Sequence, residues 1–129
     1  MDKGKKFEVK AEINVTLTQE DIDDIMCSAL EGGICYWASE AEVVEDKRCA
    51  DWGHEQIARG GALILHDAES SDKWELTLEK FLNGFKLWLE NNGDRYGAVD
   101  CGKVDTSEID GEMADMIVQY AIFGQLMFG

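Results

Sequence analysis

The chain contains no proline, and only 12 basic residues stand against 27 acidic ones in its 129 positions. Because proline averages about 5% of protein sequences, the turns must be made by the 13 glycines and by Asn and Asp.

Long apolar runs are also missing. The runs at 62–65 and 126–128 are far shorter than the roughly 20 residues that span a bilayer. No apolar segment follows the N-terminal lysines, as it would in a signal peptide. We therefore expect no membrane contact and a cytoplasmic location.

The scarcity of basic residues leaves a formal net charge of −15. Self-repulsion of this size keeps a protein soluble and disfavours direct binding to nucleic acid or to anionic membranes. Two interpretations stay open. The carboxylates can form an ordinary solvated surface, or they can imitate a nucleic-acid backbone that is presented to a basic partner. Since the carboxylates are spread along the whole chain, composition does not decide between the two.

Motifs for disulfides, metal ions and covalent catalysis are absent as well. The four cysteines, Cys27, Cys35, Cys49 and Cys101, form no CxxC pair, so we predict free and mostly buried thiols. The two histidines, together with Cys49, match no structural zinc spacing. No GxSxG elbow is present. We therefore predict no metal, no cofactor and no catalytic residue, which means a protein that is not an enzyme.

Hydrophobic periodicity outlines the secondary structure. Alternation over 7–17 predicts a long half-buried strand. Thr18 then predicts the cap of a helix that ends at Gly32-Gly33, where glycine would adopt the left-handed conformation. Further patterns predict strands at 41–44, 62–66 and 73–76, a short helix at 53–59, helices at 78–92 and 109–123, extended structure at 99–104, and an edge strand at 126–128. The sum is a single α+β domain over 1–129, in which about three helices pack on a mainly antiparallel sheet.

A small-molecule site is the best-supported chemical feature. Arginine is scarce, and Arg59 stands directly before Gly60 and Gly61, whose backbone N–H groups could form an anion-binding concavity. This arrangement would suit a phosphate. The alternative is that Arg59 only complements the dipole at the end of a short helix.

Other candidate ligand contacts carry the same ambiguity. Phe81 could stack on a base, but it stands one helical turn before Phe85, a spacing that is more typical of core positions. Asn91 and Asn92 could donate hydrogen bonds to a ligand, or they could cap the end of the helix at 78–92. The four tryptophans and the pair Tyr36-Trp37 could fill the core, line a pocket or form an oligomer contact.

Five segments carry a resemblance to a known group of proteins: DIDDIMCSALEGGICYW, EQIARGG, LILHDAE, KFLNGFKLWLENNG and ADMIVQYAIFG. Together they resemble small proteins that phages and mobile elements of Gram-positive gut bacteria carry. Within that group the chain is most similar to the first Thoeris anti-defence family. The resemblance covers most of the chain from Leu17 to Gly124.

The resemblance implies a homo-oligomeric sponge that sequesters a cyclic ADP-ribose isomer, and possible additional binding of cyclic oligonucleotides, without cleaving either. Arg59 would then pair with phosphate, Phe81 would stack on adenine, and Asn91 or Asn92 would donate hydrogen bonds. No basic residue follows Lys103, which argues against a second site near the C-terminus. A second hypothesis comes from the charge: an acidic inhibitor that imitates nucleic acid and occupies the binding surface of a defence nuclease, as some anti-CRISPR proteins do.

Overall fold

A capping box begins helix α1 (Gln19–Ser28) in the computed structural model of the protein, which describes residues 4–7, 9, 14–92, 99–100 and 102–129. The Thr18 hydroxyl oxygen accepts from the Asp21 backbone N–H at 3.0 Å, and Asp21 accepts from the Thr18 N–H at 2.9 Å. These two bonds satisfy N–H groups that have no partner inside the helix. The predicted cap is therefore confirmed, and Ile22, Ile25 and Met26 are buried as the periodicity requires.

The helix continues into a π-helical turn, η1 (Ala29–Gly33), and ends there. The position agrees with the prediction, but the reason that we gave for it is wrong. Gly32 has a φ of 177°, which is extended backbone and not the left-handed conformation. Glycine is needed at Gly33 because a Cβ there would overlap the carbonyl oxygen of Gly111. The two segments meet backbone to backbone, which brings η1 against the start of the last helix.

The main sheet is antiparallel and has the strand order β1-β2-β3. Its strands are β1 (Ala38–Val43), β2 (Leu63–Asp67) and β3 (Lys73–Leu76). Leu65 in the central strand pairs with Ala41 on one side and with Trp74 on the other. Three short 3₁₀ turns connect β1 to β2: η2 (Glu45–Lys47), η3 (Gly53–Glu55) and η4 (Ile57–Arg59). The three predicted strands are confirmed, and the predicted short helix at 53–59 is present as η3 and η4.

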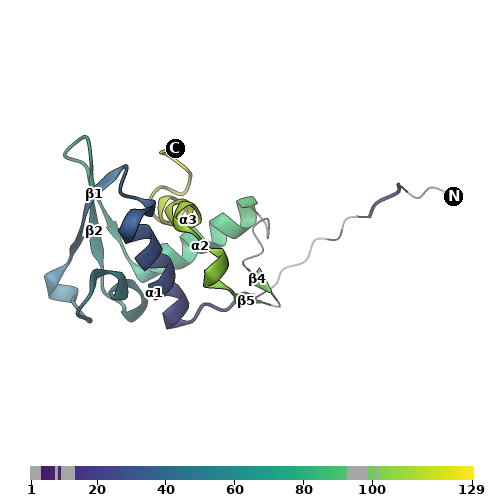
Figure 1. The fold of residues 1–129 in the computed structure, drawn as a ribbon, viewed down its shortest axis with the longest axis horizontal. Helices are drawn as coiled ribbons and strands as arrows, with labels where there is room; N and C mark the ends of the chain where they lie inside the picture. Colours follow the sequence, from purple (N-terminus) through teal and green to yellow (C-terminus); the bar gives the residue numbers. More distant parts are fainter. Residues whose placement is uncertain (1–3, 8, 10–13, 93–98, 101) are drawn as a thin grey trace.

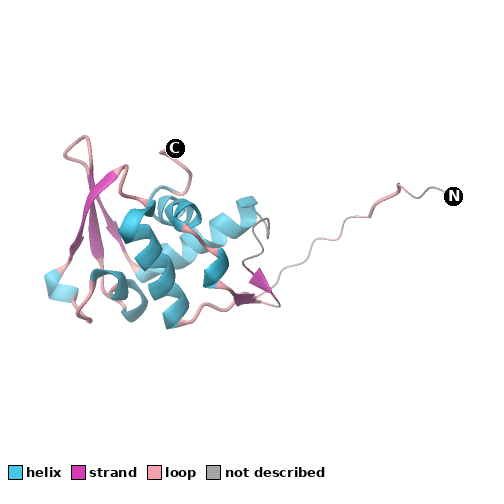
Figure 2. Cartoon of the chain, in the orientation of Figure 1, coloured by secondary structure: helices cyan, strands magenta, loops and turns pink. Residues whose placement is uncertain are grey.

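The remaining elements are helix α2 (Leu78–Asn92), the two-stranded antiparallel pair β4 (Val99–Asp100) and β5 (Lys103–Val104), the 3₁₀ turn η5 (Thr106–Glu108) and helix α3 (Gly111–Phe123). Helices α2 and α3 touch at Gly84, where an added Cβ would lie 2.6 Å from the Ala121 Cα. The three α-helices lie together, with the sheet β1–β3 on one side of them (Figures 1 and 2). Helices and sheet share one core cluster, which includes Ile25, Leu65, Phe81 and Ile117. The predicted α+β class, with helices on a mainly antiparallel sheet, is confirmed.

The predicted strand at 7–17 is wrong at the positions that the structure describes. Among them, only Thr16 makes a β-bridge, and this is an isolated parallel bridge to Lys103. Phe7 and Val9 are 79% and 87% exposed. Positions 8 and 10–13 of the predicted strand lie outside the described residues. The alternating pattern shows which faces a strand would have, but it does not show that a pairing edge lies within reach.

Two further predictions are wrong. The segment 126–128 forms no strand, because its backbone is held by a side chain of α3, as described below. The described cysteines are free as predicted, but Cys35 and Cys49 are exposed and Cys27 is half-buried. Burial raises the pKa of Cys27, with smaller contributions from Glu31 and Asp24. Cys101 lies outside the described residues.

Over the described ranges, no helix has both the length and the apolarity that a membrane crossing requires.

Candidate functional site

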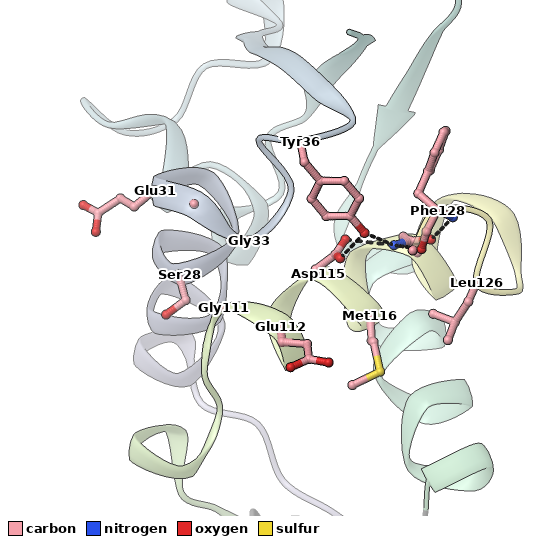
Figure 3. Close-up of a pocket in the computed structure, with 13 residues that line it drawn as sticks. Ser28, Glu31, Gly33, Tyr36, Gly111, Glu112, Asp115, Met116, Leu126 and Phe128 are labelled. Atoms are coloured by element: carbon pink, nitrogen blue, oxygen red, sulfur yellow. Dashed lines mark hydrogen bonds between the residues drawn. The ribbon is translucent and has the colours of Figure 1, made fainter. Parts of the chain in front are cut away.

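An open groove of about 690 Å³ lies between η1, α3 and the segment that follows α3. It is lined by Ser28, Glu31, Gly32, Gly33, Tyr36, Gly111, Glu112, Asp115, Met116, Gln119, Leu126, Phe128 and Gly129. The backbone contact between Gly33 and Gly111 joins two of its walls (Figure 3). Helix α3 contributes Glu112, Asp115, Met116 and Gln119. They share one helix face because Glu112 and Gln119 each stand three and four positions from the adjacent pair Asp115 and Met116.

A buried carboxylate organises one end of the groove. Asp115 is 6% exposed and accepts three hydrogen bonds from neutral donors. The Tyr36 hydroxyl donates to Oδ2 at 2.6 Å, the Trp37 indole N–H donates to Oδ1 at 2.8 Å, and Gln119 Nε2 donates to Oδ1 at 2.9 Å. Such bonds offset the cost of removing a carboxylate from water. Asp115 therefore needs no basic partner, and its oxygens are already used within the protein.

Tyr36 connects this network to solvent. The residue is 54% exposed, yet its hydroxyl points inward to Asp115 (Figure 3). Desolvation of the hydroxyl, followed by its hydrogen bond to Asp115 and repulsion from that charge, raises the pKa of Tyr36 to about 12. The hydroxyl therefore stays protonated at physiological pH and acts as a donor. A phenol held in this state is a poor general base.

Gln119 holds the segment that follows α3, which forms another wall of the groove. This residue is 1% exposed, and its Oε1 accepts from the N–H groups of Met127 and Phe128, both at 2.8 Å. The ring of Phe128 stacks on Trp37 with a centroid separation of 5.1 Å and an interplanar angle of 4°. The segment after α3 is thus fixed by hydrogen bonds and by stacking, and it supplies Leu126 and Phe128 to the groove.

The groove is acidic and apolar. None of the described residues that line it is basic. Glu112 is exposed on α3 near Met116, whereas the Glu31 carboxylate points away from Tyr36 and lies at the outer rim (Figure 3). Tyr36 and Leu126 add exposed apolar surface, with Leu126 46% exposed. This combination suits a ligand group that carries a positive charge beside apolar surface, such as a lysine or arginine side chain.

Metal binding receives no support from the described part of the chain, in which no three histidine, cysteine, aspartate or glutamate residues group closely enough to hold an ion. In the groove, the carboxylate oxygens of Asp115 accept structural hydrogen bonds, and Tyr36 is held as a donor.

The structure places Arg59 outside the groove, in an ion pair with two residues of the same chain. Its Nη1 lies 3.0 Å from Asp23 Oδ1 and donates to the Glu55 carbonyl at 2.8 Å, and its Nη2 lies 3.8 Å from a Glu55 carboxylate oxygen. The hydrogen bond to Asp23 raises the pKa of Arg59 above its ordinary value. Gly60 has a positive φ of 92°, as expected at the end of a short helix. The N–H groups of Gly60 and Gly61 donate to the carbonyls of Ile57 and Gln56, so in this conformation both amides are engaged within the turn.

The other candidate contacts also serve the fold. Phe81 is 0% exposed within the core cluster. The Asn91 and Asn92 side chains donate to the Leu87 and Trp88 carbonyls, which is the helix-capping alternative. None of the six candidate residues, Arg59, Gly60, Gly61, Phe81, Asn91 and Asn92, lines the groove. The structure therefore does not bring them to the cavity described above.

Sequence reasoning missed the groove residues, although one signal was present. Most of the buried residues of helix α3 are apolar. Asp115 and Gln119, four positions apart, are the two amide or acid side chains among them. Two polar side chains one helical turn apart in an otherwise apolar helix indicate a buried hydrogen-bond network. The partners Tyr36 and Trp37 had been singled out as a pair without an assigned role. Trp37 is a core residue, 2% exposed, while Trp52 is 65% exposed.

Comparisons with protein-family models, with curated proteins and with solved structures find no match to this chain.

Proposed function

We propose that this protein is a non-catalytic acidic binding protein that inhibits a basic partner, with the groove between η1 and α3 as its anchor site. A lysine or arginine of the partner enters the groove, where its charge faces Glu112 and its methylene stem contacts Tyr36, Met116 and Leu126. The partner is a protein whose basic surface otherwise binds nucleic acid, such as a defence nuclease.

One observation carries this proposal: the groove combines carboxylate and apolar side chains and has no basic residue among those that line it. A cation gains from nearby carboxylates, whereas a phosphate is repelled by them. The formal net charge of −15 extends the same preference over the whole molecule. It would speed encounter with a basic partner and make the association sensitive to salt.

Sequestration of a cyclic ADP-ribose isomer is the other candidate, and the resemblance of five sequence segments favours it. It requires donors for two phosphates. Arg59 is the candidate donor with a charge, and its side chain is 26% exposed but already paired with Asp23 and Glu55. A second subunit would have to supply further donors. We rank this function second for that reason.

The test uses purified, basic DNA-cleaving defence nucleases with a DNA substrate, titrated with the wild-type protein at low and at high salt. We expect inhibition of cleavage at low salt that weakens at high salt and that an added cyclic ADP-ribose isomer does not change. Glu112→Lys should abolish inhibition, since it reverses the charge inside the groove. Glu90→Lys is the matched control, because it makes the same charge change at an exposed position of α2 outside the groove and should retain most of the inhibition.

Equal inhibition by wild type and Glu112→Lys would contradict the role of the groove. Calorimetry against cyclic ADP-ribose isomers separates the two candidates. Heat of binding with an isomer, together with no inhibition of any nuclease, would favour sequestration over the acidic inhibitor.

A further inference from the structure

The N-terminal segment exposes two large apolar side chains to solvent. Phe7 is 79% and Val9 is 87% exposed, and Lys5 and Lys6 beside them are exposed as well. The Lys5 Nζ lies 5.2 Å from the Phe7 ring centroid, which is a contact within the segment itself. In Figure 1 the purple segment that holds these residues lies well away from the helices and the sheet. Exposed apolar side chains that alternate with charges are typical of a segment that docks on another surface.

Charge is distributed unevenly between this segment and the rest of the chain. Four of the 12 basic residues stand within the first ten positions, together with two of the 27 acidic ones. The other 25 acidic residues and the other eight basic residues follow the first ten positions. A segment that is locally basic will be attracted to the acidic surface that follows it in the sequence, and this holds equally for the surface of another copy.

The segment and the groove match in chemistry. In an extended chain, alternate side chains share a face, so Lys5, Phe7 and Val9 would point the same way. The groove offers a carboxylate at Glu112 and apolar surface at Tyr36, Met116 and Leu126. Each side supplies what the other lacks: a cation against a carboxylate, and an aromatic ring against exposed apolar side chains.

We infer that the N-terminal segment of one copy docks in the groove between η1 and α3 of a second copy, with Phe7 as the apolar anchor and Lys5 facing Glu112. The groove is then completed by residues of a neighbouring subunit, and the protein self-associates through this contact. The inference uses the groove of the proposed function, and it adds that self-association and a basic partner compete for the same surface.

Sedimentation velocity from low micromolar to near-millimolar concentration tests the inference. We expect the wild type to self-associate and the variant Lys5→Glu/Phe7→Ser to associate at least about tenfold more weakly, since it removes both the charge and the apolar anchor. Leu82→Ser/Lys86→Glu is the matched control. It makes the same chemical changes at two exposed positions of α2 and should leave self-association unchanged.

A charge exchange makes the test specific for this pair of surfaces. Lys5→Glu alone places a carboxylate against Glu112, and Glu112→Lys alone places two lysines against each other, so each variant should self-associate weakly. In an equimolar mixture, the reversed segment meets the reversed groove, and the native segment meets the native groove. The mixture should therefore recover association close to that of the wild type.

Three results would overturn the inference. The first is a wild type that stays monomeric over the whole concentration range, which includes the case in which the segment docks in the groove of its own chain. The others are self-association that survives Lys5→Glu/Phe7→Ser, and a mixture of the two charge variants that associates no better than either variant alone. The proposed function is tested separately from self-association. Inhibition of a basic nuclease should persist or improve in Lys5→Glu/Phe7→Ser, because the groove itself is intact there. Failure of the proposed function would instead be recognised by equal inhibition from wild type and Glu112→Lys.

Discussion

The side-chain amide of Gln119 holds the backbone of Phe128 from both sides. Oε1 accepts from the Phe128 N–H at 2.8 Å, and Nε2 donates to the Phe128 carbonyl at 3.2 Å. The same Nε2 donates to Asp115, and Asp115 accepts from the indole of Trp37, on which the Phe128 ring stacks. These four residues form a closed loop of contacts. The loop fixes the wall of the groove that the segment after α3 provides.

Gln119→Glu should destabilise the protein by about 3 kcal/mol, because it places a second carboxylate next to Asp115 in a buried site and removes the donor to Phe128. Urea denaturation measures the free energy of unfolding. Gln125→Glu makes the same change at an exposed position outside the loop and should have an effect within about 0.5 kcal/mol. Similar losses in the two variants would show that the Gln119 contacts do not stabilise the fold.

Tyr36 should titrate late. Its pKa is raised to about 12 from an ordinary value of 10.0 in the folded state, so the stability that its hydroxyl contributes is complete below pH 10.0 and is lost as the pH rises toward 12. Phenolate absorbance of the folded protein should show one tyrosine ionising near pH 12. This step should vanish in Tyr36→Phe and survive in Tyr120→Phe. A late step that survives in Tyr36→Phe would assign the shift to another tyrosine.

Arg59→Ala should lower the midpoint of thermal unfolding, because Asp23 and Glu55 lose a partner that links α1 to η4. Arg48→Ala is the control. It removes an arginine whose pair with Glu45 is exposed on the surface and should have a smaller effect. If Arg59→Ala leaves the midpoint unchanged but weakens binding of a cyclic ADP-ribose isomer, Arg59 is a ligand contact and the sequestration hypothesis gains support.

Gly84→Ala should destabilise the protein by about 2 kcal/mol, although alanine is the better helix former by about 1 kcal/mol. The added Cβ would lie 2.6 Å from the Cα of Ala121 and would force α2 and α3 apart. Asn83→Ala, at the neighbouring exposed position, should instead stabilise by about 0.5 kcal/mol. Both values come from chemical denaturation. A gain in stability from Gly84→Ala would show that the helices do not approach this closely.

Local patterns predicted most of the fold. The cap at Thr18, the stripes of the three helices and the short apolar stretches of β1, β2 and β3 depend on residues a few positions apart, so the sequence carries them directly. The strand at 7–17 failed because a strand also needs a paired edge. The segment at 126–128 failed because its apolar residues meet Trp37 and Gln119 and not a strand.

The site could not be predicted in the same way. The hydroxyl of Tyr36 and the carboxylate of Asp115 belong to residues 79 positions apart, and the close contact between Gly33 and Gly111 helps to bring their elements together. Arg59 attracted attention because arginine is rare in the chain. Its partner Asp23 lies 36 positions earlier, so the sequence could not reveal that the charge is already paired.

Chemical-shift mapping of the labelled protein shows directly whether the groove binds a basic and apolar ligand, with a short synthetic peptide of alternating lysine and phenylalanine as the probe. We expect salt-sensitive shifts in the backbone amides of Tyr36, Glu112, Met116 and Leu126, and a loss of these shifts in Glu112→Lys but not in the α2 variant Glu90→Lys. Shifts that centre on Arg59 and Gly60, or shifts at the groove that Glu112→Lys leaves unchanged, would contradict it.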